Sequence, residues 1–560
     1  MTPLPVRPKR TEAMATRDGT RLVADIWQPE GPGPWPVLMM RQAYGRRIGT
    51  SLCYAPPEWY AARGYIVVMQ DVRGRGESGG GFALFEHEAA DGADSIAWAA
   101  ALPGSNGRVG MFGFSFQGSN QLLAAGEPCP ALKAIAPAMI GWDIRRDWAY
   151  ENGAFALRAN IGWATQLAAE TARLAGDREA QARLYAASRT ASFADAMPAW
   201  PEHDALLQRY SHYAVWRDTP LDDPYWDAIS PATRQARIVA NGPATLLIGG
   251  WYDSHLPGTL AAFRALAPHL PARLIVGPWA HFPWDRRVGA LDFGEDAITD
   301  IDQQQVAWFD RWLKDDAPGD GSGDGSGDGP AVRLFDMGAR CWRDFAAWPE
   351  GDAAPGATPE QARLGLDGSG RAAIDMRDGR LLEGGAGAPG WESLTLDPWR
   401  PAAPCGGSFG WPPGPVDRAG ADARADTLTF TGAPATERVL IAGDVRLSAR
   451  IESAHASFDL HAVLSRVAAD GRSFPLAEGY ATLEPGAVSV PMRATCCTLQ
   501  PGERLRLSLA LACFPSFPVN PGTGRPPWEA GIFDHQVVTV RLRRDKSILH
   551  VPLRAAEEQA

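Results

Sequence analysis

The most constraining feature of this chain is a stretch in which a single serine separates a strand pattern from a helix pattern. Residues 108–118 read Arg-Val-Gly-Met-Phe-Gly-Phe-Ser-Phe-Gln-Gly, an apolar run that breaks at Gly113, presents Ser115 and passes into an amphipathic segment. A serine on a sharp strand-to-helix turn stands above a sheet edge, where a histidine can take its proton and the helix N-terminus can stabilise an oxyanion. The stretch is typical of a nucleophile elbow and predicts an acyl-transfer hydrolase.

Further apolar runs on both sides of the elbow predict a doubly wound α/β sheet. The runs at 36–40 and 65–69 are continuously apolar, which suits strands that helices cover on both faces. Residues 90–101 supply one such helix. The strand-like runs are, in order, 19–27, 36–40, 65–71, 132–137, 244–250 and 272–277.

A segment rich in Ala, Arg and Trp interrupts the sheet pattern between residues 143 and 240. Apolar residues recur there at helical spacing, and strand-like runs resume after it. We therefore predict a helical cap inserted into one α/β-hydrolase domain. That domain comprises residues 1–142 and 241–350.

The remaining residues, 351–560, contain short alternating segments separated by Gly and Pro turns, such as 444–451 and 504–509. This pattern predicts an all-β sandwich or jelly roll. A low-complexity Gly/Asp/Ser run at 319–329 precedes it and has the composition of a flexible loop. The run lacks the regular aliphatic position that stacked calcium-binding turns need, so no calcium site is expected.

Composition narrows the choice of partners. The length of the chain, 560 residues, suggests about three domains.

The net charge of −11 leaves no basic excess to neutralise phosphates, so we expect neither nucleic acid nor a membrane as partner. No run approaches the length of a membrane span, and no apolar core of signal-peptide length follows the basic N-terminus, which favours the cytoplasm. A small-molecule substrate is the expected partner.

The cysteines predict neither a disulfide framework nor a zinc site. There are seven, an odd number, with no CxxC pair, and Cys496 and Cys497 are adjacent. We interpret them as reduced and mostly buried thiols. No metal and no other cofactor is expected.

An elbow serine needs a histidine as base and an acid to orient it. In the α/β-hydrolase fold the acid and then the histidine follow the serine along the chain, each at the end of a strand. Asp253 and His281 satisfy this order. His255 as base and Asp285 as acid are weaker candidates, and Ser119, one helical turn past Ser115, is expected to be a helix residue.

An oxyanion hole needs two donors. The residue after the nucleophile supplies a backbone N–H, which here belongs to Phe116. No glycine-rich loop follows the early strand at 36–40, so we expect a side-chain donor there, and Tyr44 has the only neutral hydroxyl in residues 41–45. The alternative for Tyr44 is a packing aromatic.

Five motifs resemble those of the CocE/NonD hydrolases, a group related to X-Pro dipeptidyl-peptidases and α-amino-acid ester hydrolases. The resemblance runs from about residue 17 to the C-terminus and includes the β domain. It implies Ser115 as nucleophile, His281 as base and Asp253 as acid, and it implies an oxyanion hole made by the Tyr44 hydroxyl and the Phe116 N–H. The motifs are Arg-Gln-Ala-Tyr ending at Tyr44 and residues 70–76, 113–118, 250–253 and 277–281.

One departure from the general elbow is Gln117, where many hydrolases have glycine, although Gly118 follows it. A bulkier residue is expected to crowd the turn. The resemblance also implies, for the amino-acid ester hydrolases, a carboxylate cluster that holds a substrate ammonium. The sequence does not place such a cluster.

We therefore predict a serine hydrolase that cleaves carboxylic esters or amides through an acyl-enzyme. The alternatives are an X-Pro dipeptidyl-peptidase or a β-lactam acylase type of amidase and, more remotely, a non-catalytic β-sandwich binding protein. Ester or amide preference and oligomeric state stay open. The candidate substrate-binding residues, which equally suit the core of the cap, are Trp142, Trp148, Phe155 and Trp163, with His255 as a further contact.

Overall fold

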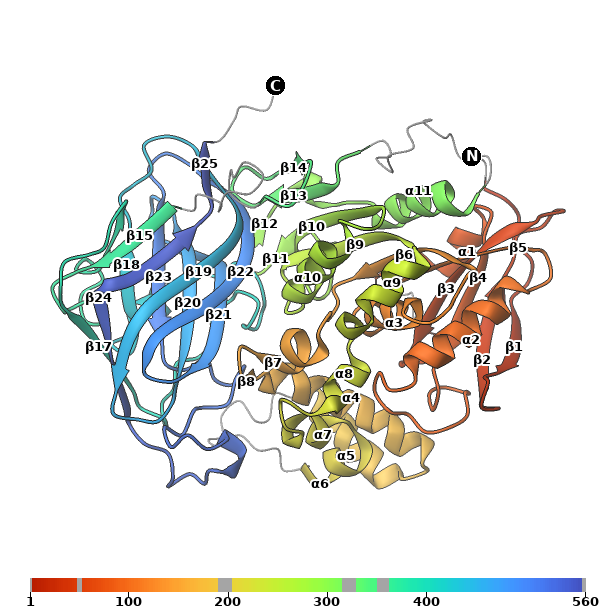
Figure 1. Ribbon diagram of the computed structural model, residues 1–560, viewed down its shortest axis with the longest axis horizontal. Helices are drawn as coiled ribbons and strands as arrows, with labels where there is room; N and C mark the ends of the chain where they lie inside the picture. Colours follow the sequence, from red (N-terminus) through yellow and green to blue (C-terminus); the bar gives the residue numbers. More distant parts are fainter. Residues whose placement is uncertain (1–2, 48–52, 190–203, 315–328, 350–361, 556–560) are drawn as a thin grey trace.

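The computed structural model describes residues 3–47, 53–189, 204–314, 329–349 and 362–555. The Gly/Asp/Ser run at 319–329 lies outside these residues, except for Gly329. Figure 1 shows an α/β part, a β part beside it, and a helical part that contacts both. The predicted fold class, an α/β hydrolase with a helical cap and a C-terminal β-sandwich, is confirmed.

In the described chain, ten strands form one sheet in the order β1-β2-β4-β3-β5-β6-β9-β10-β13-β14. Neighbours from β4 to β13 in this order pair in parallel, and the strands at both edges are antiparallel. The strands are β1 (Arg10–Ala15), β2 (Arg21–Trp27), β3 (Trp35–Gln42), β4 (Ile66–Asp71), β5 (Ser105–Phe114), β6 (Leu132–Ala138), β9 (Ala244–Tyr252), β10 (Ala272–Ala280), β13 (Val332–Asp336) and β14 (Cys341–Phe345).

Helices cover both faces of this sheet because its central strands are apolar on both sides. Along β3, Val37 and Met39 join a core that includes α2 and α3, whereas Leu38 and Met40 join a second core that includes α1 and α11. The helices are α1 (Pro57–Ala61), α2 (Glu88–Ala100), α3 (Phe116–Ala125), α10 (Leu256–Leu266) and α11 (Ile301–Leu313). Short elements between β10 and α11 are β11 (Arg287–Val288), β12 (Leu291–Asp292) and η3 (Glu295–Ala297).

The segment between β6 and β9 is mainly helical, as expected, but it contains a small hairpin that was not predicted. Asn152 and Gly153 both have positive φ, 44° and 90°, which suits the Asn-Gly turn of a two-residue hairpin. The elements are η1 (Arg145–Ala149), β7 (Tyr150–Glu151), β8 (Ala154–Phe155), α4 (Leu157–Leu174), α5 (Arg178–Ser188), α6 (Asp204–Tyr210), α7 (Tyr213–Asp218), α8 (Pro224–Ile229), η2 (Pro231–Arg234) and α9 (Gln235–Asn241).

The C-terminal strands fold back on themselves. In the pairing order of this sheet, β21 stands at one end and β22 at the other. The two strands nevertheless approach each other, because a Cβ on Gly479 of β21 would lie 2.2 Å from the Pro491 carbonyl oxygen of β22. The sheet therefore closes into a sandwich around an apolar interior. Its elements are β15 (Ala362–Asp367), β16 (Arg380–Glu383), β17 (Trp391–Leu396), α12 (Ala419–Asp422), β18 (Leu428–Thr431), β19 (Val439–Ser453), β20 (Phe458–Val467), β21 (Ser473–Leu483), β22 (Gly486–Leu499), β23 (Arg504–Ala510), η4 (Pro527–Glu529), β24 (Val538–Val551) and β25 (Leu553–Ala555).

Within the described ranges, no helix is long and apolar enough to cross a membrane. Five of the seven cysteines are buried, and Cys496 and Cys497 are fully so in β22.

Candidate active site

Ser115 lies on the turn between β5 and α3 with φ 60° and ψ −125°, a conformation that non-glycine residues rarely adopt. Its N–H donates to the Ala138 carbonyl at 2.8 Å, which ties the turn to the end of β6. Gly113 and Gly118 make the turn possible, because a Cβ at Gly113 would lie 2.5 Å from the Gln117 Cβ and one at Gly118 would lie 2.4 Å from Ile140. The crowding expected at Gln117 is thus relieved by Gly113.

Three side chains meet above this turn. His281, directly after β10, has Nδ1 2.8 Å from Asp253 Oδ1 and Nε2 3.0 Å from Ser115 Oγ. A proton on Nδ1 donates to the carboxylate, which leaves Nε2 as acceptor for the serine hydroxyl. The structure brings together the three residues that their order along the chain singles out.

Asp253, directly after β9, is fully buried. Burial alone would raise the pKa of its carboxyl group, but interactions with His281 and, to a lesser extent, with His255 together outweigh burial and lower the pKa below its usual value. An ionised carboxylate at this position holds the imidazole in one tautomer and stabilises its protonated form.

Asp285 and Ser119, two of the alternatives to these three residues, form hydrogen bonds with other groups. Asp285 accepts a hydrogen bond from the Arg287 N–H at 3.0 Å. Ser119 is buried, and its hydroxyl donates to the Gly141 carbonyl at 3.2 Å. Both contacts suit structural roles.

Tyr44 follows β3, and its hydroxyl oxygen accepts a hydrogen bond from Trp163 Nε1 at 2.9 Å. Burial raises the pKa of this phenol to about 12, although the Trp163 bond and the charge of Arg75 act in the opposite direction. Tyr44 therefore keeps its proton at neutral pH and can donate it. Phe116 is the first residue of α3, and N–H groups in the first turn of a helix have no acceptor within the helix. The Phe116 N–H can therefore donate to an oxyanion.

A row of aromatic rings connects His281 to Tyr44. His255 lies 5.0 Å from His281, Trp148 lies 4.1 Å from His255, and Trp163 lies 5.0 Å from Trp148, all between ring centroids. His255 Nδ1 hydrogen-bonds the Asp147 carbonyl at 3.2 Å, which fixes Nδ1 as the protonated nitrogen. Burial lowers the pKa of His255 to about 4, so its ring is neutral at physiological pH.

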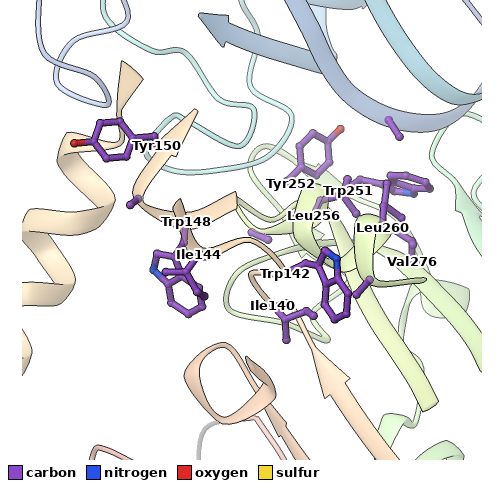
Figure 2. Packing of buried hydrophobic residues seen from close by; sticks show 14 of the residues in the cluster. Ile140, Trp142, Ile144, Trp148, Tyr150, Trp251, Tyr252, Leu256, Leu260 and Val276 are labelled. Atoms are coloured by element: carbon purple, nitrogen blue, oxygen red, sulfur yellow. The ribbon is translucent and has the colours of Figure 1, made fainter. Parts of the chain in front are cut away.

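Two other pocket candidates lie elsewhere. Phe155 packs against Tyr150 and Tyr213 of the cap and against Trp528 of η4 in the C-terminal part. Trp142 is buried and packs close to α10. Gly258 of that helix lies so near that a Cβ on it would come within 2.9 Å of the Trp142 backbone nitrogen. Figure 2 shows Trp142 and Trp148 within one cluster of buried residues.

Two residues beside the site were missed. Phe85 stacks on Phe116 at 5.2 Å and contacts Trp148 edge-on at 5.4 Å, despite a positive φ of 64°. A non-glycine residue in this conformation is uncommon and signals a special position, but the sequence does not reveal it.

Arg75 was also missed, because the motif at residues 70–76 does not indicate that this arginine is buried. It is 1% exposed, lies 3.6 Å from the Phe82 ring and donates to the Leu167 carbonyl at 3.2 Å. It has no carboxylate partner among the residues that the structure describes, and burial lowers its pKa to about 10. Arg75 remains charged at neutral pH, and its field favours negative charge near Tyr44.

The described ranges contain no cluster of three or more His, Cys, Asp or Glu side chains suited to a metal ion.

Comparison with known families and proteins gives matches over almost the whole chain. Residues 18–283 match the model of the X-Pro dipeptidyl-peptidase (S15) family, and residues 325–549 match the C-terminal non-catalytic domain of X-Pro dipeptidyl-peptidases. Cocaine esterase of Rhodococcus sp. (strain MB1 Bresler) is 31% identical over 538 residues, covering 91% of each chain.

Two solved structures share the complete fold. An aminopeptidase from a marine sediment archaeon, Thaumarchaeota archaeon, has a TM-score of 0.75 at 22% identity, with 97% of this chain and 96% of that chain covered. An α-amino acid ester hydrolase also has a TM-score of 0.75 at 22% identity, covering 98% and 97%.

These matches define a serine hydrolase that acts on esters or amides and combines an α/β-hydrolase part with a β-sandwich. With 31% identity to cocaine esterase over 91% of both chains, the protein belongs to the CocE/NonD family of hydrolases.

Proposed function

We propose that Ser115, His281 and Asp253 are the catalytic triad and that the protein hydrolyses carboxylic esters through an acyl-enzyme. The observation that carries this proposal is the position of His281, whose ring bridges Asp253 at 2.8 Å and Ser115 at 3.0 Å. Each of the three side chains follows the end of a parallel strand, where open α/β sheets bind their ligands.

In the proposed reaction His281 Nε2 takes the proton of Ser115 as Oγ attacks the substrate carbonyl. The Tyr44 hydroxyl and the Phe116 N–H stabilise the resulting oxyanion. His281 then protonates the leaving alcohol, and the acyl group stays on Ser115. Water, activated by the same imidazole, releases the acid and restores the serine.

An apolar, and by preference aromatic, acyl group is the proposed substrate feature. Trp148 and Trp163 present their rings between His255 and Tyr44, next to the proposed oxyanion donors. Aromatic side chains stack favourably with an aryl group. The relationship to cocaine esterase also favours an ester substrate.

The substrate class is tested with a matched panel on purified protein. Esters of aromatic acids, acylated β-lactams and X-Pro aminoacyl amides are compared by kcat/KM. The proposal predicts the highest values for the esters of aromatic acids. Selective cleavage of X-Pro amides would instead assign the peptidase activity for which the matched family is named.

The proposed partner is a small molecule, and the proposed compartment is the cytoplasm. The compartment is supported by the cysteines, because all seven are reduced thiols. Cell fractionation with an antibody against the protein tests it, and recovery outside the cytoplasmic fraction would contradict it.

A further inference from the structure

We propose that the C-terminal β-sandwich positions the acid of the triad and that Arg493 is the positioning residue. This inference rests on the proposed role of Asp253. The matched family model describes the sandwich as a non-catalytic domain. Its contacts in this chain nevertheless reach both neighbours of Asp253.

The first contact is made by Tyr252, the residue before Asp253. Its hydroxyl donates to the Pro475 carbonyl of β21 at 3.2 Å, and the ring is buried. Figure 2 shows the Tyr252 hydroxyl pointing toward the strands of the sandwich. Burial raises the pKa of this phenol above its usual value, so the donor stays protonated.

The second contact is made to Ser254, the residue after Asp253. Arg493 of β22 donates from Nη2 to the Ser254 carbonyl at 3.0 Å. Its side chain is 3% exposed, and its guanidinium lies 4.3 Å from the Phe409 ring. A planar guanidinium with several donors is suited to hold groups from different elements at fixed angles.

Arg493 also fixes the cap to the same point. Nη1 and Nη2 lie 3.2 and 3.1 Å from the two Glu151 carboxylate oxygens, a bidentate ion pair with the β7–β8 hairpin. The hairpin is anchored further, because Asn152 Nδ2 donates to the Tyr480 carbonyl at 2.9 Å. Arg493 thus joins the sandwich, the cap hairpin and the turn that carries the acid.

These contacts restrict the turn that carries the acid. Asp253 bonds Nδ1 of His281 at 2.8 Å, and its position depends on the two residues beside it. Small misplacements of a catalytic group reduce the rate strongly even when the substrate still binds. A positioning role therefore predicts a loss in kcat rather than a rise in KM.

The test compares Arg493→Gln with Arg544→Gln. Arg544 is a matched control because it is also buried in the sandwich, pairs with Glu392 at 2.9 Å and donates to nearby carbonyls. All of these partners belong to the sandwich itself. We expect both variants to lower Tm, but only Arg493→Gln to lower kcat, by about 10- to 100-fold with KM changed less than about two-fold.

A double-mutant cycle shows whether Arg493 acts through Asp253. In an Asp253→Asn background, Arg493→Gln should cost less than about two-fold further, because the interaction it supports is already lost. The acid limb of the kcat/KM profile should move to lower pH in Arg493→Gln, since a displaced carboxylate stabilises a protonated base less. Arg493→Lys, which keeps one charged donor, should recover part of kcat.

Equal kcat in the Arg493 and Arg544 variants, or an undiminished loss in the Asp253→Asn background, would overturn the inference. If Arg493→Gln does not fold, Tyr252→Phe removes only one hydroxyl and is tested in the same cycle, with a loss of about three-fold expected. Wild-type kcat in Asp253→Asn alone would contradict the proposed function instead.

Discussion

The indole nitrogen of Trp163 donates a hydrogen bond to the Tyr44 hydroxyl oxygen across 2.9 Å. Trp163 belongs to α4 of the cap, and Tyr44 follows β3 of the sheet, so the bond joins two layers of the molecule beside the elbow. A phenol oxygen that accepts this bond keeps its own proton for another acceptor. The cap thereby orients the group that we propose as an oxyanion donor.

Tyr44→Phe should lower kcat by about 10² to 10³ and leave KM nearly unchanged, because the donor acts on charge that develops in the transition state. Steady-state kinetics on an aryl ester measure both constants. An unchanged kcat would assign Tyr44 to packing alone.

Trp163→Phe keeps an aromatic ring but removes the indole donor, and should lower kcat about 3- to 10-fold. Trp148→Phe is the matched control, since Trp148 contacts Trp163 at 5.0 Å and its ring packs on His255 rather than bonding Tyr44. In a Tyr44→Phe background, Trp163→Phe should have little further effect. A full additional loss of kcat in the Tyr44→Phe background would mean that Trp163 acts directly on the substrate rather than through Tyr44.

Gly118→Ala should destabilise the protein by about 1–3 kcal/mol, because its Cβ would lie 2.4 Å from Ile140 and 2.8 Å from the Ala138 carbonyl. Gly162→Ala provides the contrast. A Cβ there, in the middle of α4, has open space and should stabilise by about 0.5–1 kcal/mol. Urea unfolding measures both changes, and a Gly118→Ala variant as stable as the wild type would contradict the elbow packing.

Acid should destabilise the fold through buried neutral histidines. Burial lowers the pKa of His212 to about 3, against about 6.5 in an unfolded chain. The unfolded state therefore binds a proton between these values that the folded state does not, and stability falls as pH drops below about 6.5. His255, with its pKa lowered to about 4, acts in the same direction.

His212→Phe should remove one of these contributions. It should reduce the loss of unfolding free energy between pH 7 and pH 5 by about 2 kcal/mol. Denaturant titrations at the two pH values measure the difference. The same pH dependence in wild type and variant would show that His212 takes up its proton in the folded state.

The sequence predicts those parts of the molecule that local patterns encode. Apolar runs identify β3, β4, β6, β9 and β10, and the positions of Asp253 and His281 at strand ends follow from the parallel order of the sheet. Contacts between distant segments leave no such pattern. Arg493 and Ser254 are 239 positions apart, and neither residue type indicates the other.

Residue type alone also fails to separate core from site among the aromatics. Trp148 and Trp163 lie beside His255 and Tyr44, whereas Phe155 packs between cap and sandwich. All of them are aromatic residues within or next to one helical segment. Only the three-dimensional arrangement distinguishes them.

The most direct test of the proposed mechanism is covalent labelling with a fluorophosphonate probe, followed by peptide mass spectrometry. We expect one adduct, on the peptide that contains Ser115, and neither adduct nor turnover in Ser115→Ala. An adduct on another serine, or ester turnover that persists in Ser115→Ala, would contradict the proposed mechanism.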